Sequence, residues 1–203
     1  MSEPTGPAAV ENPFSTRRVR PGAVPFLFAG EQSTGRLIER LKENGWWGQI
    51  VGPHGAGKSA LLATLVPVIE QAGRHTLLVE LHDGQRRLPG GLLRTDCPAE
   101  PTMLIVDGYE QLGRLSRFRL KRFCRRGGLG LLVTSHRPVG LPDLYRLTAD
   151  LELLQRLVEQ IQRDYPVHVT ADEVAERFVE NGGNVREVLF ALYDLYENRR
   201  RSR

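Results

Sequence analysis

Cysteine and long apolar runs are both scarce in this sequence of 203 residues. The only cysteines are Cys97 and Cys124, and their spacing does not match a metal-binding pattern, so reduced thiols in a cytosol are the simplest account. No apolar run approaches the roughly twenty residues that a membrane-spanning helix needs. The first residues also lack the basic-then-apolar order of a secretory signal. We therefore expect a cytoplasmic protein without a membrane span.

The composition has no strong bias toward one residue type. Hydrophobic residues make up 40% and charged residues 26% of the sequence, as in a globular protein, and no internal repeat or low-complexity block is present. The length suits one α/β domain with a small appendage. The net charge of +4 is compatible with a nucleic acid or an acidic protein partner and is diagnostic of neither.

A glycine-rich stretch follows the short apolar run that ends at Ile50 and Val51. From Gly52 to Ser59 it matches the phosphate-binding pattern G-x-x-x-x-G-K-[ST] at every fixed position. Loop glycines let backbone N–H groups surround a phosphate, and the helix predicted from Ala60 to Ala72 points its positive end at the same place. Lys58 is expected to reach the outer phosphates of ATP or ADP and Ser59 to hold Mg²⁺. The predicted nucleotide-binding residues are Gly52, Pro53, His54, Gly55, Ala56, Gly57, Lys58, Ser59 and Ala60.

A second nucleotide signal is the apolar strand Met103–Val106, which ends in Asp107. A carboxylate at the carboxyl end of a buried strand lies beside the crevice where open α/β sheets bind ligands. Asp107 can therefore hold the same Mg²⁺ ion as Ser59. The position downstream of a phosphate loop strengthens this interpretation.

Further strands and helices are predicted from the apolar pattern. The nearly continuous apolar run Thr76–Leu81 is typical of a parallel strand buried on both faces, and Leu144–Leu147 is a candidate fifth strand. Gly130–Ser135 is predicted to be a strand with a polar end, so Thr134 or Ser135 lies next to the γ-phosphate if this strand neighbours the loop strand. Arg137, just beyond it, is either structural or a phosphate sensor. From Thr148 onward the pattern is helical only.

The segment Gln111–Arg126 is predicted to be a helix with two contrasting sides. Leu112, Leu115, Leu120 and Phe123 fall on the side expected to be buried. The opposite side is either a solvated face or a surface for a nucleic acid or an acidic protein. Its residues, none of them acidic, are Arg114, Arg117, Lys121 and Arg125.

Together these motifs resemble the AAA+ superfamily of ATPases, and the nearest likeness is to small AAA-type ATPases of bacterial secretion and transposition accessory systems. The resemblance begins at Asn12-Pro13-Phe14, continues through Gly52–Ser59 and Asp107, and ends at Asn181–Arg186, which is similar to the lid segment that carries the sensor 2 arginine. It implies that Thr134 or Ser135 is sensor 1. It also implies that Arg186 contacts the γ-phosphate from a lid whose closure over ATP is the mechanical output.

We therefore expect an α/β fold: a P-loop NTPase with a central, mostly parallel sheet of about five strands flanked by helices, and a small C-terminal helical lid. The predicted segments are a flexible tail at 1–22, a nucleotide-binding core at 23–147, the lid at 148–198 and a basic tail at 199–203.

One position departs from the family pattern. The family usually has Asp-Glu at the end of this strand, whereas Asp107 is followed by Gly108. Glu110 and Glu80 are both candidates for the base that activates water, and the sequence does not choose between them. We expect a slow ATPase that binds ATP and Mg²⁺ and couples nucleotide state to lid closure and partner binding.

Several alternatives stay open at this point. The first is a nucleotide-gated interaction module with little turnover. The second is a small-molecule kinase whose acceptor pocket lies within 83–101. Nucleic-acid binding coupled to ATP and assembly into a homo-oligomer are further possibilities.

Overall fold

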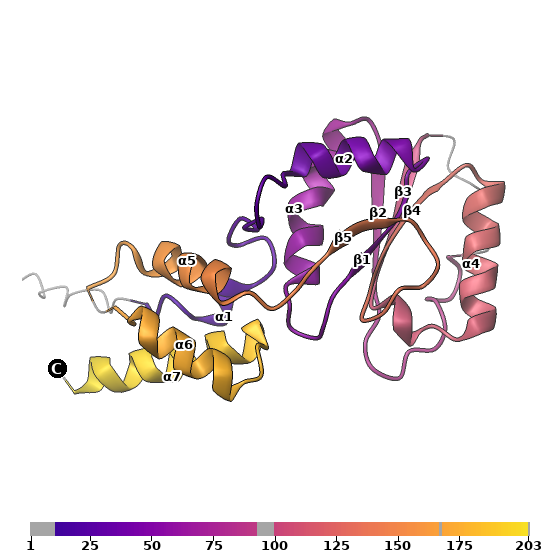
Figure 1. The fold of residues 1–203 in the computed structure, drawn as a ribbon. Coiled ribbons are helices and arrows are strands. Elements are labelled where there is room, and N and C mark those ends of the chain that lie inside the picture. The colour runs from indigo at the N-terminus through magenta and orange to yellow at the C-terminus, as the bar shows by residue number, and fades with distance from the viewer. Residues whose placement is uncertain (1–10, 93–99, 167, 203) are drawn as a thin grey trace, which may run out of the picture. The chain divides into compact units, whose positions relative to one another are not determined.

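The computed structural model describes residues 11–92, 100–166 and 168–202 and divides the chain into two compact units (Figure 1). One unit spans Phe28–Thr148, and the other combines the described residues up to Leu27 with those from Ala149 onward. Cys97 lies outside the described residues, as does the stretch 93–99 of the proposed acceptor pocket. Within the described part of the chain, no helix is both long and apolar enough to cross a bilayer.

Five parallel strands form the sheet of the unit Phe28–Thr148, in the order β2-β3-β4-β1-β5. The predicted α/β fold with five strands is therefore confirmed, and the sheet is wholly rather than mostly parallel. β4 pairs with β1, so the polar end of β4 lies beside the end of the loop strand, with Ser135 opposite Val51. The strands are β1 (Trp47–Val51), β2 (His75–Glu80), β3 (Thr102–Asp107), β4 (Gly130–Ser135) and β5 (Asp143–Arg146).

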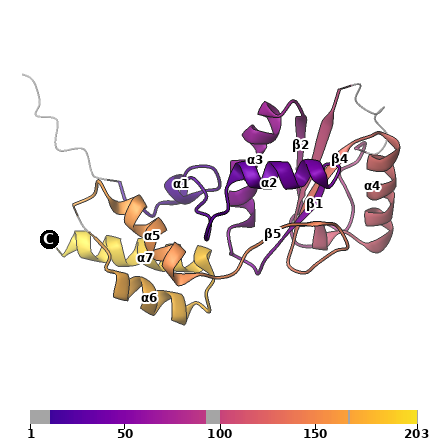
Figure 2. The ribbon, with the colours of Figure 1, turned by 45° about the horizontal axis from the view of Figure 1, so that its top comes forward.

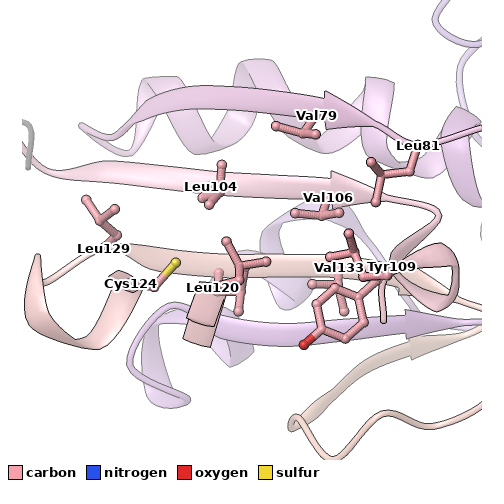
Figure 3. Packing of buried hydrophobic residues seen from close by; sticks show 11 residues of the cluster. Val79, Leu81, Leu104, Val106, Tyr109, Leu120, Cys124, Leu129 and Val133 are labelled. Atoms are coloured by element: carbon pink, nitrogen blue, oxygen red, sulfur yellow. The ribbon is translucent and has the colours of Figure 1, made fainter. Parts of the chain in front are cut away.

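Helices cover both faces of this sheet. Helices α2 (Thr34–Glu43) and α3 (Lys58–Gln71) lie on one side, and α4 (Arg114–Arg126) lies on the other (Figures 1 and 2). On the α4 side, alternate residues of β3 and β4 pack against Leu120 and Cys124 (Figure 3). This alternation follows from the two-residue period of a strand. A 3₁₀ turn, η1 (Tyr109–Gln111), joins the end of β3 to α4.

Two predictions about burial are wrong. β2 is an edge strand, and Leu77 and Leu78 are 44% and 46% exposed, so its apolar run does not reflect burial on both faces. The helix predicted from Gln111 begins instead at Arg114, after the 3₁₀ turn and Gly113. Its buried side runs through Leu120 and Cys124, which places Leu115 on the opposite, exposed side.

The second unit is helical and has its own core. Three of its helices begin at side chains that accept hydrogen bonds from backbone N–H groups: Asp150 for α5, Thr170 for α6 and Asn184 for α7. Thr170 and Glu173 form a capping box at the start of α6. The helices are α1 (Thr16–Val19), α5 (Leu151–Gln162), α6 (Ala171–Glu180) and α7 (Val185–Arg201).

Residues 11–22 correct the prediction of a flexible tail. Phe14 is fully buried in the core of the helical unit, with its ring edge-to-face against Tyr196. The amide of Asn12 donates hydrogen bonds to the carbonyl of Tyr193 (3.0 Å) and to Glu197 (2.9 Å). The segment is therefore held against α7, and only residues 1–10 of the predicted tail lie outside the described residues.

The predicted basic tail at 199–203 is mostly helix, because α7 continues to Arg201. Arg199 forms an ion pair with Glu173 and donates to the carbonyl of His168 (2.8 Å). This arginine therefore ties α7 to the start of α6.

Replacing Phe14 by alanine should leave a cavity in the helical unit and lower the free energy of unfolding by about 3–5 kcal/mol. Phe118→Ala is the matched control, since that side chain is 63% exposed and its loss should change stability by about 0.5 kcal/mol or less. Urea denaturation followed by circular dichroism measures both. Equal, small effects would contradict the packing of Phe14.

Candidate functional site

The glycine-rich loop connects β1 to α3. Gly55 and Gly57 have φ values of +72° and +92°, which residues with a side chain rarely adopt. A Cβ atom on Gly52 would lie 2.8 Å from Cβ of Leu147 at the end of β5, so this position also requires glycine. The first turn of α3 has N–H groups without acceptors inside the helix, and they carry its positive dipole end. The loop therefore presents backbone donors suited to an anion.

Lys58, the first residue of α3, lies across this loop. Its ammonium group donates hydrogen bonds to the carbonyl oxygens of Gly52 (2.8 Å) and Pro53 (2.7 Å). Burial lowers the pKa of Lys58, and the nearby carboxylates of Glu110 and Asp107 oppose that shift. A phosphate offers this ammonium group charged acceptors, which make stronger hydrogen bonds than neutral carbonyls.

Asp107 joins three elements at the mouth of the loop. One of its oxygens accepts a hydrogen bond from Ser59 at the start of α3 (2.6 Å), and the other accepts one from Thr134 near the end of β4. The Thr134 hydroxyl in turn accepts from the N–H of Gly108 (2.9 Å). The predicted site residues Ser59, Asp107 and Thr134 therefore form one connected cluster beside Lys58.

The donor set of this cluster fits magnesium. The Ser59 hydroxyl and the Asp107 carboxylate are hard oxygen ligands, and they lie next to each other. In the described part of the chain no group of three or more His, Cys, Asp or Glu residues forms an all-protein metal cage. Mg²⁺ typically takes one or two protein oxygens and completes its shell with phosphates and water. When bound, it supplies positive charge that neutralises phosphate oxygens.

Gly108 explains why glutamate does not follow Asp107. Its φ is +81°, and a Cβ atom there would lie 2.7 Å from the carbonyl oxygen of Leu81. No side chain fits without moving that backbone. The chain instead turns through η1, and the carboxylate that this turn brings to the site is that of Glu110.

Glu110 is held close to the loop. One of its oxygens lies 3.1 Å from Nε2 of His136, the residue after β4. The other oxygen is buried and has no hydrogen-bond partner among the described residues. Glu110 therefore has one oxygen fixed by a neighbour and one buried oxygen without a partner among the described residues.

Glu80 is placed differently. It is the last residue of β2, in register with Asp107, and it is exposed. Within residues 11–92, 100–166 and 168–202 its carboxylate makes no hydrogen bond, and it is not among the charges that act on Lys58.

Two histidines lie next to each other at the site, and the sequence pattern did not predict that they form a pair. His54 in the loop and His136 have ring centroids 5.5 Å apart, tilted by 57°. The only sequence signal was the position of His136 directly after the polar end of a strand. The pair connects the phosphate loop to Glu110 through His136.

The remaining predicted site residues lie outside this cluster of hydrogen bonds. Ser135 is buried, and its hydroxyl donates to the carbonyl of Arg137 (2.7 Å), so it supports the backbone and does not contact Asp107. The side chain of Arg137 is exposed. Arg186 is also exposed, in the first turn of α7 in the helical unit.

The predicted basic strip of Arg114, Arg117, Lys121 and Arg125 is not a single exposed face. Arg117 is half-buried and donates hydrogen bonds to the carbonyls of Leu112 and Glu110, both at 2.8 Å. Lys121 is half-buried and donates to the carbonyl of Val139 (3.2 Å). These two cations support the backbone around the site, whereas Arg114 and Arg125 are exposed.

Tyr109 anchors the turn that carries Glu110. Its side chain is fully buried (Figure 3). The Arg117 guanidinium lies 5.3 Å from the ring centroid. Burial raises the pKa of Tyr109 to about 12. Among the described residues its hydroxyl has no hydrogen-bond partner.

No protein-family model and no curated protein matches this sequence. Solved structures do have a similar fold. The Orc1 protein of Aeropyrum pernix, in complex with DNA, superposes with a TM-score of 0.64 at 14% identity, over 91% of this chain and 64% of that chain. The replication initiator DnaA, bound to AMPPCP and single-stranded DNA, gives 0.57 at 15% identity, over 84% and 63%. A Walker-type ATPase of Pyrococcus abyssi gives 0.50 at 12%, over 86% and 77%.

These likenesses show the fold alone, an α/β fold with a parallel central sheet flanked by helices. The chain spans less than two thirds of the Orc1 and DnaA chains that it matches. The similar structures do not support the nearer likeness to ATPases of secretion and transposition accessory systems, which stays a prediction.

Tyr109→Phe removes a buried hydroxyl without a partner and should raise the free energy of unfolding by about 1 kcal/mol at pH 7. An unfolded tyrosine ionises near pH 10, but the folded phenol resists ionisation up to about pH 12, so the wild type loses stability across this interval. The Tyr109→Phe variant should not lose this part of its stability, because it has no phenol to ionise. Urea denaturation at pH 7 and about pH 11 measures the difference, and equal losses in both proteins would contradict the burial of the phenol.

Proposed function

We propose that this protein binds ATP and Mg²⁺ at the loop 52–59 and hydrolyses ATP slowly. The observation that carries the proposal is the Ser59–Asp107–Thr134 cluster at the mouth of a loop of backbone donors. Similarity of fold to AMPPCP-bound DnaA adds support from an independent direction. More features of the structure support ATP binding than support ATP hydrolysis, because every feature of the loop serves binding.

Glu110 is the base in this proposal. In the proposed step its carboxylate accepts the proton of a water molecule as the water oxygen attacks the γ-phosphorus and the bond to the β–γ bridging oxygen breaks. His136 holds one carboxylate oxygen, and Arg117 holds the backbone carbonyl of the same residue. Glu80 lacks such support, so Glu110 is the better candidate.

The positions of the arginines support the proposal of slow turnover. In fast phosphoryl-transfer enzymes an arginine stabilises the charge of the transition state. Within the described residues no arginine side chain forms a hydrogen bond or ion pair with the side chains of Ser59, Asp107, Thr134 or Glu110. Arg137, exposed beside the site, and Arg186 are the proposed sources of that charge in a closed or assembled state.

The helical unit is the proposed lid, with Arg186 contacting the γ-phosphate and its closure coupling nucleotide state to partner binding. This division places the core at 28–148 and adds residues 11–27 to the lid. We extend the proposal to a cytoplasmic ATPase similar to those of secretion and transposition accessory systems. The sequence triplet Asn12-Pro13-Phe14 supports this likeness, and its residues Asn12 and Phe14 pack against α7.

Lys58→Ala should weaken ATP binding at least about tenfold, because it removes the charge that is placed to meet the outer phosphates. Lys42→Ala is the matched control, since Lys42 is an exposed lysine that pairs with Glu39 on α2. Titration with a fluorescent ATP analogue in the presence of Mg²⁺ measures both variants. Equal affinity of Lys58→Ala and wild type would rule out the loop as the nucleotide site.

Glu110→Gln should keep ATP binding and slow phosphate release on the order of 10²-fold, because an amide cannot take the proton from water. Glu80→Gln should leave the rate within about twofold, since this carboxylate is not held at the loop. Single-turnover phosphate release separates the two variants. If Glu80→Gln is the slower one, the assignment of the base is wrong, and if the wild type itself releases no phosphate, the chain is a nucleotide-gated interaction module.

A further inference from the structure

The outward side of α4 carries exposed arginines around two exposed apolar side chains. Leu115 is 62% and Phe118 is 63% exposed, and they are one helical turn apart. The exposed residues recur at spacings of three and four, so they form one continuous stripe on the side of the helix that faces away from the sheet. We define the α4 outer face as Arg114, Leu115, Phe118, Arg119, Arg122, Arg125 and Arg126.

The charge of this face is of one sign. α4 contains no aspartate or glutamate. In the part of the chain that the structure describes, the side chains of Arg114, Arg119, Arg122 and Arg126 form no hydrogen bond and no ion pair, and the guanidinium of Arg125 lies 5.4 Å from the centre of the Trp47 ring. Like charges one turn apart on a helix repel one another. A ligand with several negative charges removes that repulsion.

The composition of the face favours protein over nucleic acid as this ligand. All of its cations are arginine, and arginine and aromatic residues are enriched at protein interfaces while lysine is depleted. A phosphate backbone pairs with the arginines but leaves Leu115 and Phe118 uncovered, because phosphate contacts use polar and charged groups. An acidic segment that also carries apolar side chains satisfies both parts of the face.

We propose that the α4 outer face binds an acidic amphipathic segment of a partner protein. Leu115 and Phe118 pack against the apolar residues of that segment, and the surrounding arginines pair with its carboxylates. Arg119 and Arg122 are central to the charge pairing, since Arg119 lies within one turn of both apolar side chains and Arg122 lies one turn beyond Phe118. The face is built on the outer side of a helix whose inner side is fixed by Leu120 and Cys124, so it is rigid before the partner binds.

Two synthetic peptides test this proposal by fluorescence anisotropy at physiological salt. One has about fifteen residues, enough to follow the 13 residues of α4, with leucines at helical spacing and glutamates elsewhere. The other has the same charge with every leucine replaced by serine. The leucine peptide should bind at least about tenfold more tightly than the serine peptide. An oligothymidylate of similar charge should bind more weakly than the leucine peptide.

Three variants assign the binding to this face. L115S/F118S should lower the affinity for the leucine peptide at least about tenfold and hardly change the affinity for the serine peptide. R119E/R122E should abolish binding of the leucine peptide. The matched control R156E/V179S changes one exposed arginine and one exposed apolar residue of the helical unit and should bind like the wild type. Unchanged circular dichroism shows that each variant folds.

Three results would overturn the proposal. Equal binding of the two peptides means that the face selects charge alone. Tighter binding of the oligothymidylate through the same arginines assigns the face to nucleic acid. Concentration-dependent self-association in sedimentation, lost in L115S/F118S, assigns the face to a second copy of the chain.

Discussion

The Asp107 carboxylate is the constraint on which the proposed site depends. It accepts hydrogen bonds from Ser59 and Thr134, so a single side chain fixes the start of α3 against the ends of β3 and β4. That arrangement is possible because β4 lies between β3 and the loop strand β1 and because all strands run in parallel. The topology brings three polar side chains to one edge of the sheet, and the glycine loop supplies donors for an anion beside them.

The left-handed backbone conformation of Gly108 determines which glutamate lies beside the loop. Gly108 adopts a left-handed φ against the carbonyl of Leu81, which excludes a glutamate at that position. The following turn carries Glu110 to the loop instead, with Tyr109 buried beneath it and Arg117 bonded to its carbonyl. The burial of Tyr109 and the inner side of α4 therefore serve the site as well as the core. The exposed side of α4 is left with arginines and apolar groups that the fold does not use.

The sequence predicted the fold and the loop well because both follow from local rules. Apolar runs located the strands, and the spacing from Gly52 to Ser59 matches a pattern that backbone geometry requires. Burial was harder to predict: Leu77 and Leu78 look like core residues, but strand order placed β2 at the edge. Leu115 was placed on the wrong side of α4 because it precedes the buried Leu120 by five residues, which puts the two side chains about 140° apart around the helix. The choice of Glu110 over Glu80 needed the left-handed turn, which a lone glycine does not reveal.

The proposed function requires that the backbone donors of the loop 52–59 bind a triphosphate. Isothermal titration of the wild-type protein with ATP, in magnesium and again in EDTA, tests this most directly. We expect saturable binding of one ATP per chain that weakens when EDTA removes magnesium, since Ser59 and Asp107 are placed to share that ion. Absence of binding up to about 1 mM ATP, or binding that is indifferent to magnesium, would contradict it.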